Sequence, residues 1–175
     1  LPGSKYRDAA ARIRFHEDVL ERLSAAPGIR SVATAMQAPM RPTITRGVWI
    51  EGGPAPPPGE ANLTAFLTVS EQYFETTGIR LLRGRTLTRD DNLRSPDVVV
   101  INEAFARRYF PGQDPIGKRI AYGARNDDHY WRTIVGLAAD TREQLGQPPK
   151  ATTYAPFRQG LDPFTFAAYL VKTSL

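Results

Sequence analysis

Residues 96–110 read P-D-V-V-V-I-N-E-A-F-A-R-R-Y-F and join two patterns of different period. The β-branched run at 98–101 is too short for a helix by itself and is typical of a strand that is covered on both faces. Asn102 then predicts a helix N-cap, because its side-chain oxygen can accept from the first backbone N–H groups of a helix, and the Pro-Gly pair at 111–112 ends that helix. The sequence therefore predicts a buried strand that passes directly into a short amphipathic helix, a scaffold that carries no catalytic side chain.

The composition limits the class of protein. With 175 residues, of which 41% are hydrophobic and 10% aromatic, the chain is long enough to bury a core and falls in the globular class. The net charge of +5 is spread out, since residues 1–50 carry eight basic and four acidic groups and residues 51–100 carry five and seven. A nucleic-acid surface usually gathers basic and aromatic residues in one stripe, so we expect no nucleic-acid partner.

The sequence contains no cysteine, which excludes disulfides, thiolate catalysis and cysteine-based metal sites. No window approaches the roughly 20 consecutive apolar residues of a membrane span, and no signal peptide precedes Leu1, so we expect these residues to be soluble. The chain starts without Met and ends on a strand-like segment. We interpret it as a piece of a longer protein.

The rest of the chain predicts a mixture of helices and strands. Apolar residues at three- and four-residue spacing predict a helix over 7–25, which the Pro-Gly pair at 27–28 ends. Ser70 predicts the N-cap of a second short helix, in which Tyr73 and Phe74 face inward. Alternating or continuous apolar residues predict strands at 29–36, 47–51, 61–69, 98–101, near 120, at 130–138, 152–157 and 164–172.

Two segments between these elements are predicted to be exposed. Residues 52–59 contain four prolines and three glycines and cannot form a central strand or a helix. We interpret them as a solvated connection, with a polyproline recognition segment as the alternative. A polar tip at 123–129 separates the strand near 120 from the strand at 130–138, which predicts a hairpin.

Candidate reactive groups are few. The sequence contains neither a G-x-S-x-G nucleophile elbow nor a glycine-rich phosphate loop, because Gly52-Gly53 is followed by prolines that cannot donate a backbone N–H. His16 lies near the apolar stripe of the first helix, and we interpret it as a packed histidine rather than a ligand. Asp90 and Asp91 are adjacent, and we expect them to be solvated surface groups rather than an acid–base pair.

The remaining candidate for metal binding is the group Asp127, Asp128 and His129. Carboxylates and imidazole are legitimate metal ligands, but three consecutive residues at a hairpin tip rarely converge on one ion. An enzyme would need titratable groups that meet in one cleft, for example Asp127 and His129 together with Asp140. We therefore expect no catalytic, cofactor-binding or metal-ligating residue, no cofactor and no enzyme activity.

Six short segments, taken in order, resemble one family. The resemblance is to the MacB-like periplasmic core domain of ABC transporter permeases, in the class related to FtsX, and within it to the orphan permeases found in expanded sets in acidobacteria. It covers roughly residues 10–172. The segments are V-S-E-Q-Y-F (69–74), G-I-R-L-L-R-G-R (78–85), V-V-V-I-N-E-A-F-A-R-R-Y-F-P-G (98–112), D-P-I-G-K-R-I (114–120), I-V-G (134–136) and Y-A-P-F (154–157).

The resemblance implies an α+β fold of two lobes. Residues 1–77 and 151–175 would form a discontinuous porter-like α/β lobe, and residues 78–150 an inserted β-rich lobe. Similar domains lie in the periplasm, between the first and second transmembrane helices of a bacterial inner-membrane protein, and continue past the position of Leu175 with a further helix and strand. Leu1 and Leu175 should then lie on the same side of the domain.

The resemblance also implies a mechanical, non-catalytic function in efflux or export. The expected partners are an ABC ATPase subunit or domain that acts through the full-length permease, a second permease copy, a periplasmic adaptor protein, and the membrane through flanking helices. The alternative is a free-standing extracytoplasmic interaction module for a peptide or protein partner.

Overall fold

A computed structural model describes residues 8–39, 41, 43–57, 60–123, 130–142, 146–159 and 167–174. The mixture of helices and strands confirms the predicted α+β class. In chain order the elements are α1 (Ala9–Ser24), β1 (Ile29–Ala35), β2 (Ile44–Ile50), β3 (Leu63–Val69), α2 (Tyr73–Thr77), β4 (Leu81–Gly84), β5 (Val98–Asn102), α3 (Glu103–Tyr109), β6 (Arg119–Tyr122), β7 (Arg132–Ala138), β8 (Thr152–Pro156), the 3₁₀ turn η1 (Phe157–Gln159) and β9 (Ala168–Thr173).

Six of the strands close into a ring. β2 pairs with β6, β6 with β7, β7 with β5, β5 with β8 and β8 with β3, and β3 pairs again with β2. The β3–β8 and β5–β7 pairs are parallel. The other four pairs of the ring are antiparallel. β4 is attached to β7 from outside the ring, and β1 and β9 continue from β3.

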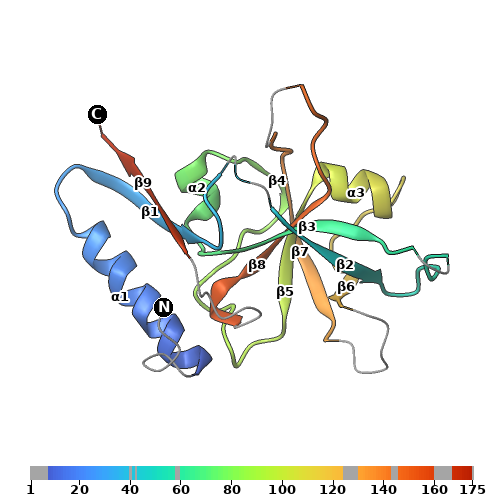
Figure 1. The fold of residues 1–175 in the computed structure, drawn as a ribbon, viewed down its shortest axis with the longest axis horizontal. Coiled ribbons are helices and arrows are strands. Elements are labelled where there is room, and N and C mark those ends of the chain that lie inside the picture. Colours follow the sequence, from blue (N-terminus) through green and yellow to red (C-terminus); the bar gives the residue numbers. More distant parts are fainter. Residues whose placement is uncertain are drawn as a thin grey trace.

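The N-terminal helix and the last strand form a separate layer next to the ring. Figure 1 shows α1, β1 and β9 together on the left and the strands of the ring to their right. β1 and β9 are antiparallel, with Ala35 opposite Ala168 and Ile29 opposite Thr173. β3 connects the two parts, because its first half pairs with β2 whereas its last residue, Val69, pairs with Ala35 of β1.

The two faces of β5 are buried in different clusters of the core. Val98 and Val100 pack in a cluster with Tyr154 of β8, whereas Val99 and Ile101 pack in a second cluster with residues of α3. All four side chains are buried, and full burial of a Val or Ile side chain contributes about 1.5–3 kcal/mol. The prediction of a strand that is covered on both faces is therefore confirmed.

The predicted helix starts had different outcomes. Asn102 caps α3 as predicted, because its Oδ1 accepts from the backbone N–H of Phe105 at 3.0 Å. The prediction for Ser70 was wrong, since α2 begins at Tyr73 with Gln72 as its N-cap. The Ser70 hydroxyl oxygen instead accepts from the backbone N–H of Thr34 at 3.0 Å and so ties the end of β3 to β1.

Several other predictions from the sequence can be compared with the observed helices and strands. The first predicted helix is confirmed as α1, and the hairpin as the antiparallel pair β6–β7. β2 begins at Ile44 rather than at residue 47, because residues 44–47 pair with β3. Residues 52–57 are neither helix nor strand, as expected. Residues 164–166, Leu1 and Leu175 lie outside the described residues.

The backbones of β4 and β7 approach each other closely at two facing glycines. Gly84 lies opposite Gly136 in the register of the two strands. A Cβ atom on Gly136 would lie 2.1 Å from the backbone oxygen of Arg85, and one on Gly84 would lie 2.2 Å from the backbone oxygen of Val135. Because backbone cannot move aside as a side-chain tip can, this contact requires glycine.

Gly136→Ala should therefore destabilise the fold. We expect a loss of about 2–3 kcal/mol in the free energy of unfolding, measured by urea denaturation of the chain, because the new methyl group forces two strands apart. Gly112→Ala is the matched control, since Gly112 has a φ of 69° but open space around its Cβ position and should cost only about 1 kcal/mol. Equal losses in the two variants would contradict the close approach.

Candidate functional site

Three consecutive residues of η1 contact three different parts of the fold, and we call them the η1 hub: Phe157, Arg158 and Gln159. η1 follows β8 directly, so the hub is fixed at the end of a strand of the ring. Figure 1 shows β8 between the α1 layer on the left and the rest of the ring on the right. The hub is therefore placed to connect these two parts of the molecule.

Phe157 belongs to the apolar contact between α1 and the sheet. It is buried in a cluster with Leu20 of α1 and Val32 of β1. Its ring lies edge-on to His16, with 6.5 Å between the ring centroids, and Nδ1 of His16 lies 2.7 Å from the hydroxyl of Tyr169 in β9. Burial lowers the pKa of His16 from 6.5 to about 4. Of the packed or boundary position predicted for His16, the structure shows the packed one.

Arg158 forms an ion-pair cluster between α1 and the segment before α2. Its guanidinium pairs with Glu17 of α1 and, at 3.3 Å, with Glu71. Arg89 adds a second cation to Glu71 at 3.3 Å. The Arg158 side chain is only 13% exposed, and burial lowers its pKa. Removing one member of such a buried pair is costly, because the partner charge is left without compensation.

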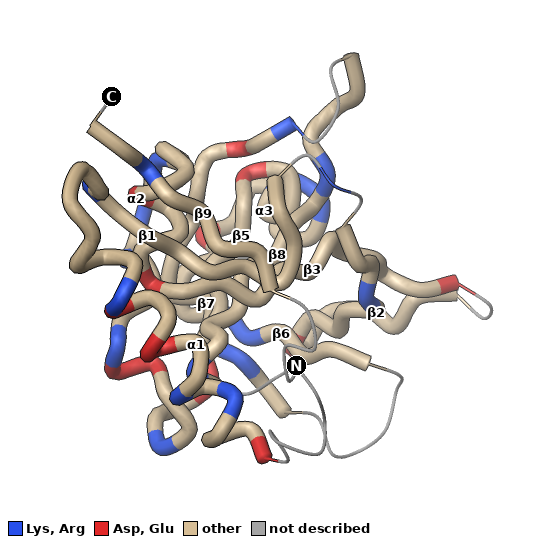
Figure 2. The backbone as a smooth tube through the Cα atoms, turned by 60° about the vertical axis from the view of Figure 1, so that its left-hand side comes forward, with Lys and Arg blue, Asp and Glu red and all other residues tan. Residues whose placement is uncertain are grey.

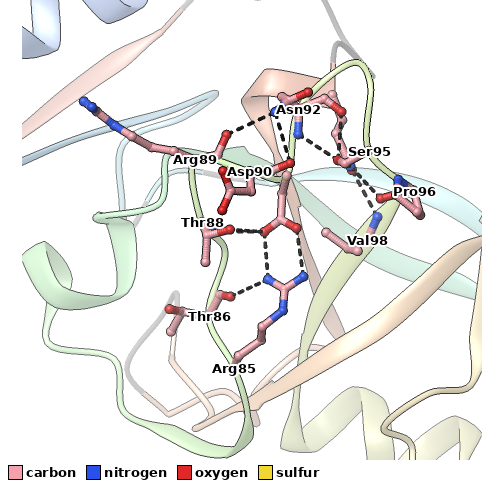
Figure 3. Close-up of polar contacts among 11 residues, drawn as sticks. Arg85, Thr86, Thr88, Arg89, Asp90, Asn92, Ser95, Pro96 and Val98 are labelled. Carbon is pink, nitrogen blue, oxygen red and sulfur yellow. Dashed lines mark hydrogen bonds and ion pairs between the residues drawn. The ribbon is translucent and has the colours of Figure 1, made fainter.

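Gln159 fixes the start of β5. Its Oε1 accepts from the backbone N–H of Val98 at 3.1 Å. Its Nε2 donates to the backbone oxygen of Pro96 at 2.9 Å and to the hydroxyl of Ser95 at 3.2 Å. Figure 3 shows Ser95, Pro96 and Val98 along the segment that enters β5. A buried amide with both its donor and its acceptor satisfied holds its neighbours in one geometry.

The segment before β5 is held by a second polar network. Arg85 donates two hydrogen bonds of 2.8 Å to the carboxylate of Asp91, which also accepts from the backbone N–H of Thr88 at 2.8 Å. Figure 3 shows Arg85 below Thr86 and Thr88, with dashed lines from its guanidinium group. Burial raises the pKa of Asp91, but the hydrogen bonds from Arg85 and Thr88 outweigh it and hold the pKa below its usual value. The expectation that Asp91 is solvated was wrong, because Arg85 pairs with it in a buried position.

Asn102 joins β5 and α3 to the start of β8. Besides capping α3, its Oδ1 accepts from the backbone N–H of Thr152 at 2.8 Å, and its Nδ2 donates to the backbone oxygen of Lys150 at 2.9 Å. The residue is fully buried. One side chain therefore satisfies polar groups of two segments that are distant in sequence.

Of the candidate metal or catalytic group considered above, only Asp140 lies within the described residues. No group of three His, Cys, Asp or Glu side chains within the described ranges is placed to hold a metal ion. Asp140 accepts a hydrogen bond from the backbone N–H of Ala104 at 2.8 Å and forms an ion pair with Arg107 at 2.6 Å. It therefore stabilises the start of α3. Asp127, Asp128 and His129 lie outside the described residues.

The distribution of charged residues and the length of the helices also bear on which kind of site this domain can carry. Figure 2 shows Lys and Arg interspersed with Asp and Glu on α1 and over the other elements, rather than gathered in one stripe. In the part of the chain that the structure describes, no helix combines the length and the apolar character of a membrane span.

The sequence analysis missed Arg158 and Gln159, because their partners are distant in sequence. For example, 61 residues separate Gln159 from Val98.

Comparisons with known proteins agree on one family. The model of the MacB-like periplasmic core domain matches residues 2–173. The macrolide export ATP-binding/permease protein MacB of Aggregatibacter actinomycetemcomitans is 32% identical over 99 residues, which are 55% of this chain and 14% of that protein. MacB of Hahella chejuensis is 33% identical over 90 residues, 51% of this chain and 13% of that protein. The chain thus spans only a small part of the length of these relatives.

Solved structures share the fold. The periplasmic region of MacB from Actinobacillus actinomycetemcomitans superposes with a TM-score of 0.61 and 22% identity, over 90% of this chain and 64% of that one. The extracellular domain of the ABC-type transporter YknZ from Gram-positive bacteria gives a TM-score of 0.60 and 16% identity, over 91% of this chain and 73% of that one.

Gln159→Leu should loosen the start of β5. The substitution keeps the side-chain volume but leaves the Val98 N–H and the Pro96 carbonyl without their partner, at a cost of about 2–3 kcal/mol in unfolding free energy. We also expect faster hydrogen exchange at the Val98 amide. Gln113→Leu, at an exposed position, is the matched control and should change neither quantity. A loss no larger than that of the control would show that Gln159 does not hold this segment.

The burial of His16 predicts a loss of stability in mild acid. The folded pKa of about 4 lies below the ordinary 6.5, so the unfolded chain binds more protons between these values and stability falls as the pH drops through them. Going from about pH 7 to about pH 5 should cost the wild type about 2 kcal/mol in unfolding free energy. His16→Gln should lose much less over the same range. If His129→Gln removes the dependence instead, the assignment to His16 is wrong.

Proposed function

The chain belongs to the MacB-like periplasmic core domain family, the periplasmic domains of MacB-like ABC transporter permeases, and we propose that it passes an ATP-driven conformational change of the permease into the periplasm for efflux or export. The domain itself is non-catalytic in this proposal. The full-length permease lies in a bacterial inner membrane, and helices outside this chain connect the domain to the bilayer. What moves the domain is therefore the membrane part of the same protein.

The observation that carries the proposal is the η1 hub. A displacement of α1 reaches Arg158 through Glu17 and Phe157 through Leu20. The neighbouring residue, Gln159, holds the entry of β5. Three contacts made by one rigid turn link the N-terminal helix to the ring, and coupling between distant sites travels through packed and hydrogen-bonded groups of this kind.

The two-lobe division, with residues 1–77 and 151–175 in one lobe and 78–150 in the other, is part of the proposal. The hydrogen bonds of Gln159 to Ser95 and Pro96, and of Asn102 to Thr152, would cross between these lobes. The ring takes β2, β3 and β8 from the first lobe and β5, β6 and β7 from the second. Because the strands are hydrogen-bonded together, the proposed movement is a small shear of packed elements rather than a wide opening.

The proposed partners follow from the family. An ABC ATPase subunit or domain supplies the energy, in keeping with relatives that are described as ATP-binding/permease proteins. A second permease copy and a periplasmic adaptor protein complete the assembly. Nucleic acid is not among the partners.

The proposal predicts that ATP moves the periplasmic domains of two permease copies relative to one another. Leu93 is 55% exposed, and the chain contains no cysteine, so Leu93→Cys accepts a spin label in a full-length permease whose other cysteines are serine. Distances between the two labels should shift by several ångströms between the nucleotide-free and the vanadate-trapped state. Unchanged distances would overturn the proposal.

The same measurement tests the η1 hub. The triple variant Glu17→Gln/Glu71→Gln/Arg158→Met removes the ion pairs without leaving a buried charge, and such replacements are often neutral for stability. We expect it to hydrolyse ATP but to show less than half of the wild-type distance shift. Arg83→Ala breaks a pair with Asp114 that is exposed on both sides and should keep the full shift. A full shift in the triple variant would exclude the ion pairs as the connection.

A further inference from the structure

A pocket of about 330 Å³ lies between α2, β3, β8 and β9, and we call it the α2 pocket. Its floor is formed by buried core residues, among them Leu67, Tyr73 and Tyr154. Leu170 of β9 forms one wall. The volume falls in the range of small-molecule sites, which are mostly apolar with a few placed polar groups.

Tyr73 offers a hydrogen-bond donor on the floor of the pocket. Tyr73 is only 4% exposed, and its ring packs against Phe74 and Tyr154. No described residue accepts a hydrogen bond from its hydroxyl. Burial raises the pKa of Tyr73, so the hydroxyl stays protonated at neutral pH. The hydroxyl can therefore donate a hydrogen bond to a ligand in the pocket.

The rim of the α2 pocket is positively charged. Arg41 and Arg142 both line the pocket and are exposed. No aspartate or glutamate is among the lining residues that the structure describes. Within the same residues, neither arginine pairs with a carboxylate. An apolar floor beneath two guanidinium groups fits a ligand with an apolar body and an anionic end.

We propose that the α2 pocket binds a medium-chain carboxylate. The carboxylate group lies between Arg41 and Arg142, and the hydrocarbon chain lies on Leu67 and Leu170. An oxygen carried by the chain accepts a hydrogen bond from the Tyr73 hydroxyl. At about 30 Å³ per water-sized group, the pocket holds about ten non-hydrogen atoms, the size of octanoate. For so few atoms, and with both arginines in water, half-saturation is expected at roughly millimolar concentration. This site requires only the folded domain and is independent of the proposed transmission of movement.

Protection of a single cysteine from a maleimide reagent tests the site in the full-length permease. Ala38→Cys places the cysteine at an exposed position that lines the pocket, and Leu82→Cys, at an exposed position outside it, is the matched control. Octanoate should slow the labelling of Ala38→Cys at least threefold and leave Leu82→Cys unchanged. Octyltrimethylammonium, a cation of the same chain length, should protect neither.

Two sets of variants test the chemistry. Adding Arg41→Gln and Arg142→Gln to Ala38→Cys should abolish the protection, while the labelling of Leu82→Cys in the same background reports that the fold is intact. We expect 8-hydroxyoctanoate to protect at a severalfold lower concentration than octanoate, and Tyr73→Phe should remove that advantage.

Three outcomes would overturn the proposal. The first is the absence of protection by either carboxylate at tens of millimolar, and the second is equal protection by the quaternary ammonium. The third is an Ala38→Cys variant that does not react without ligand, because another part of the protein would then cover the pocket. Equal protection by octanoate and 8-hydroxyoctanoate would exclude the hydrogen bond to Tyr73.

Discussion

The structure depends most on the three hydrogen bonds of Asn102. Its side chain provides the N-cap of α3, through Phe105, and also binds both Lys150 and Thr152 at the entry of β8. The pairing of β5 with β8 is short, with two residue pairs in register. A buried amide that holds both strands at their ends therefore reinforces one of the weakest contacts of the ring, and a buried network in which every member is satisfied specifies one arrangement.

The sequence predicted those parts of the fold that rest on local signals. Residues 98–102 combine a β-branched run with a capping residue, so both the strand and the helix start follow from neighbouring positions. Ser70 looks equally suitable as a cap, but its hydroxyl oxygen accepts from Thr34 of β1 instead. Gln159 was missed because its partners are distant in sequence. The partners of Asp91, Arg85 and Thr88, are close in sequence, but no spacing reveals that the pair is buried.

The attachment of the α1 layer to the ring agrees with the proposed transmission of movement through the domain. A ring of strands resists deformation, because a change of register at one strand would disturb its neighbours on both sides. The layer of α1, β1 and β9 is attached to the ring through the end of β3 and through the η1 hub. Ion pairs suit such an attachment, since they fix direction and partner more than they add stability.

The closed ring also bears on how copies of this domain behave when they are crowded at a membrane. Unpaired strand edges invite pairing with another chain and start aggregation. Among the described strands, the outer positions are taken by β4, which is four residues long and carries Arg83, and by β9, which carries Lys172. Short length and positive charge are the means by which proteins protect such edges, so neighbouring domains can touch repeatedly without seeding a fibril.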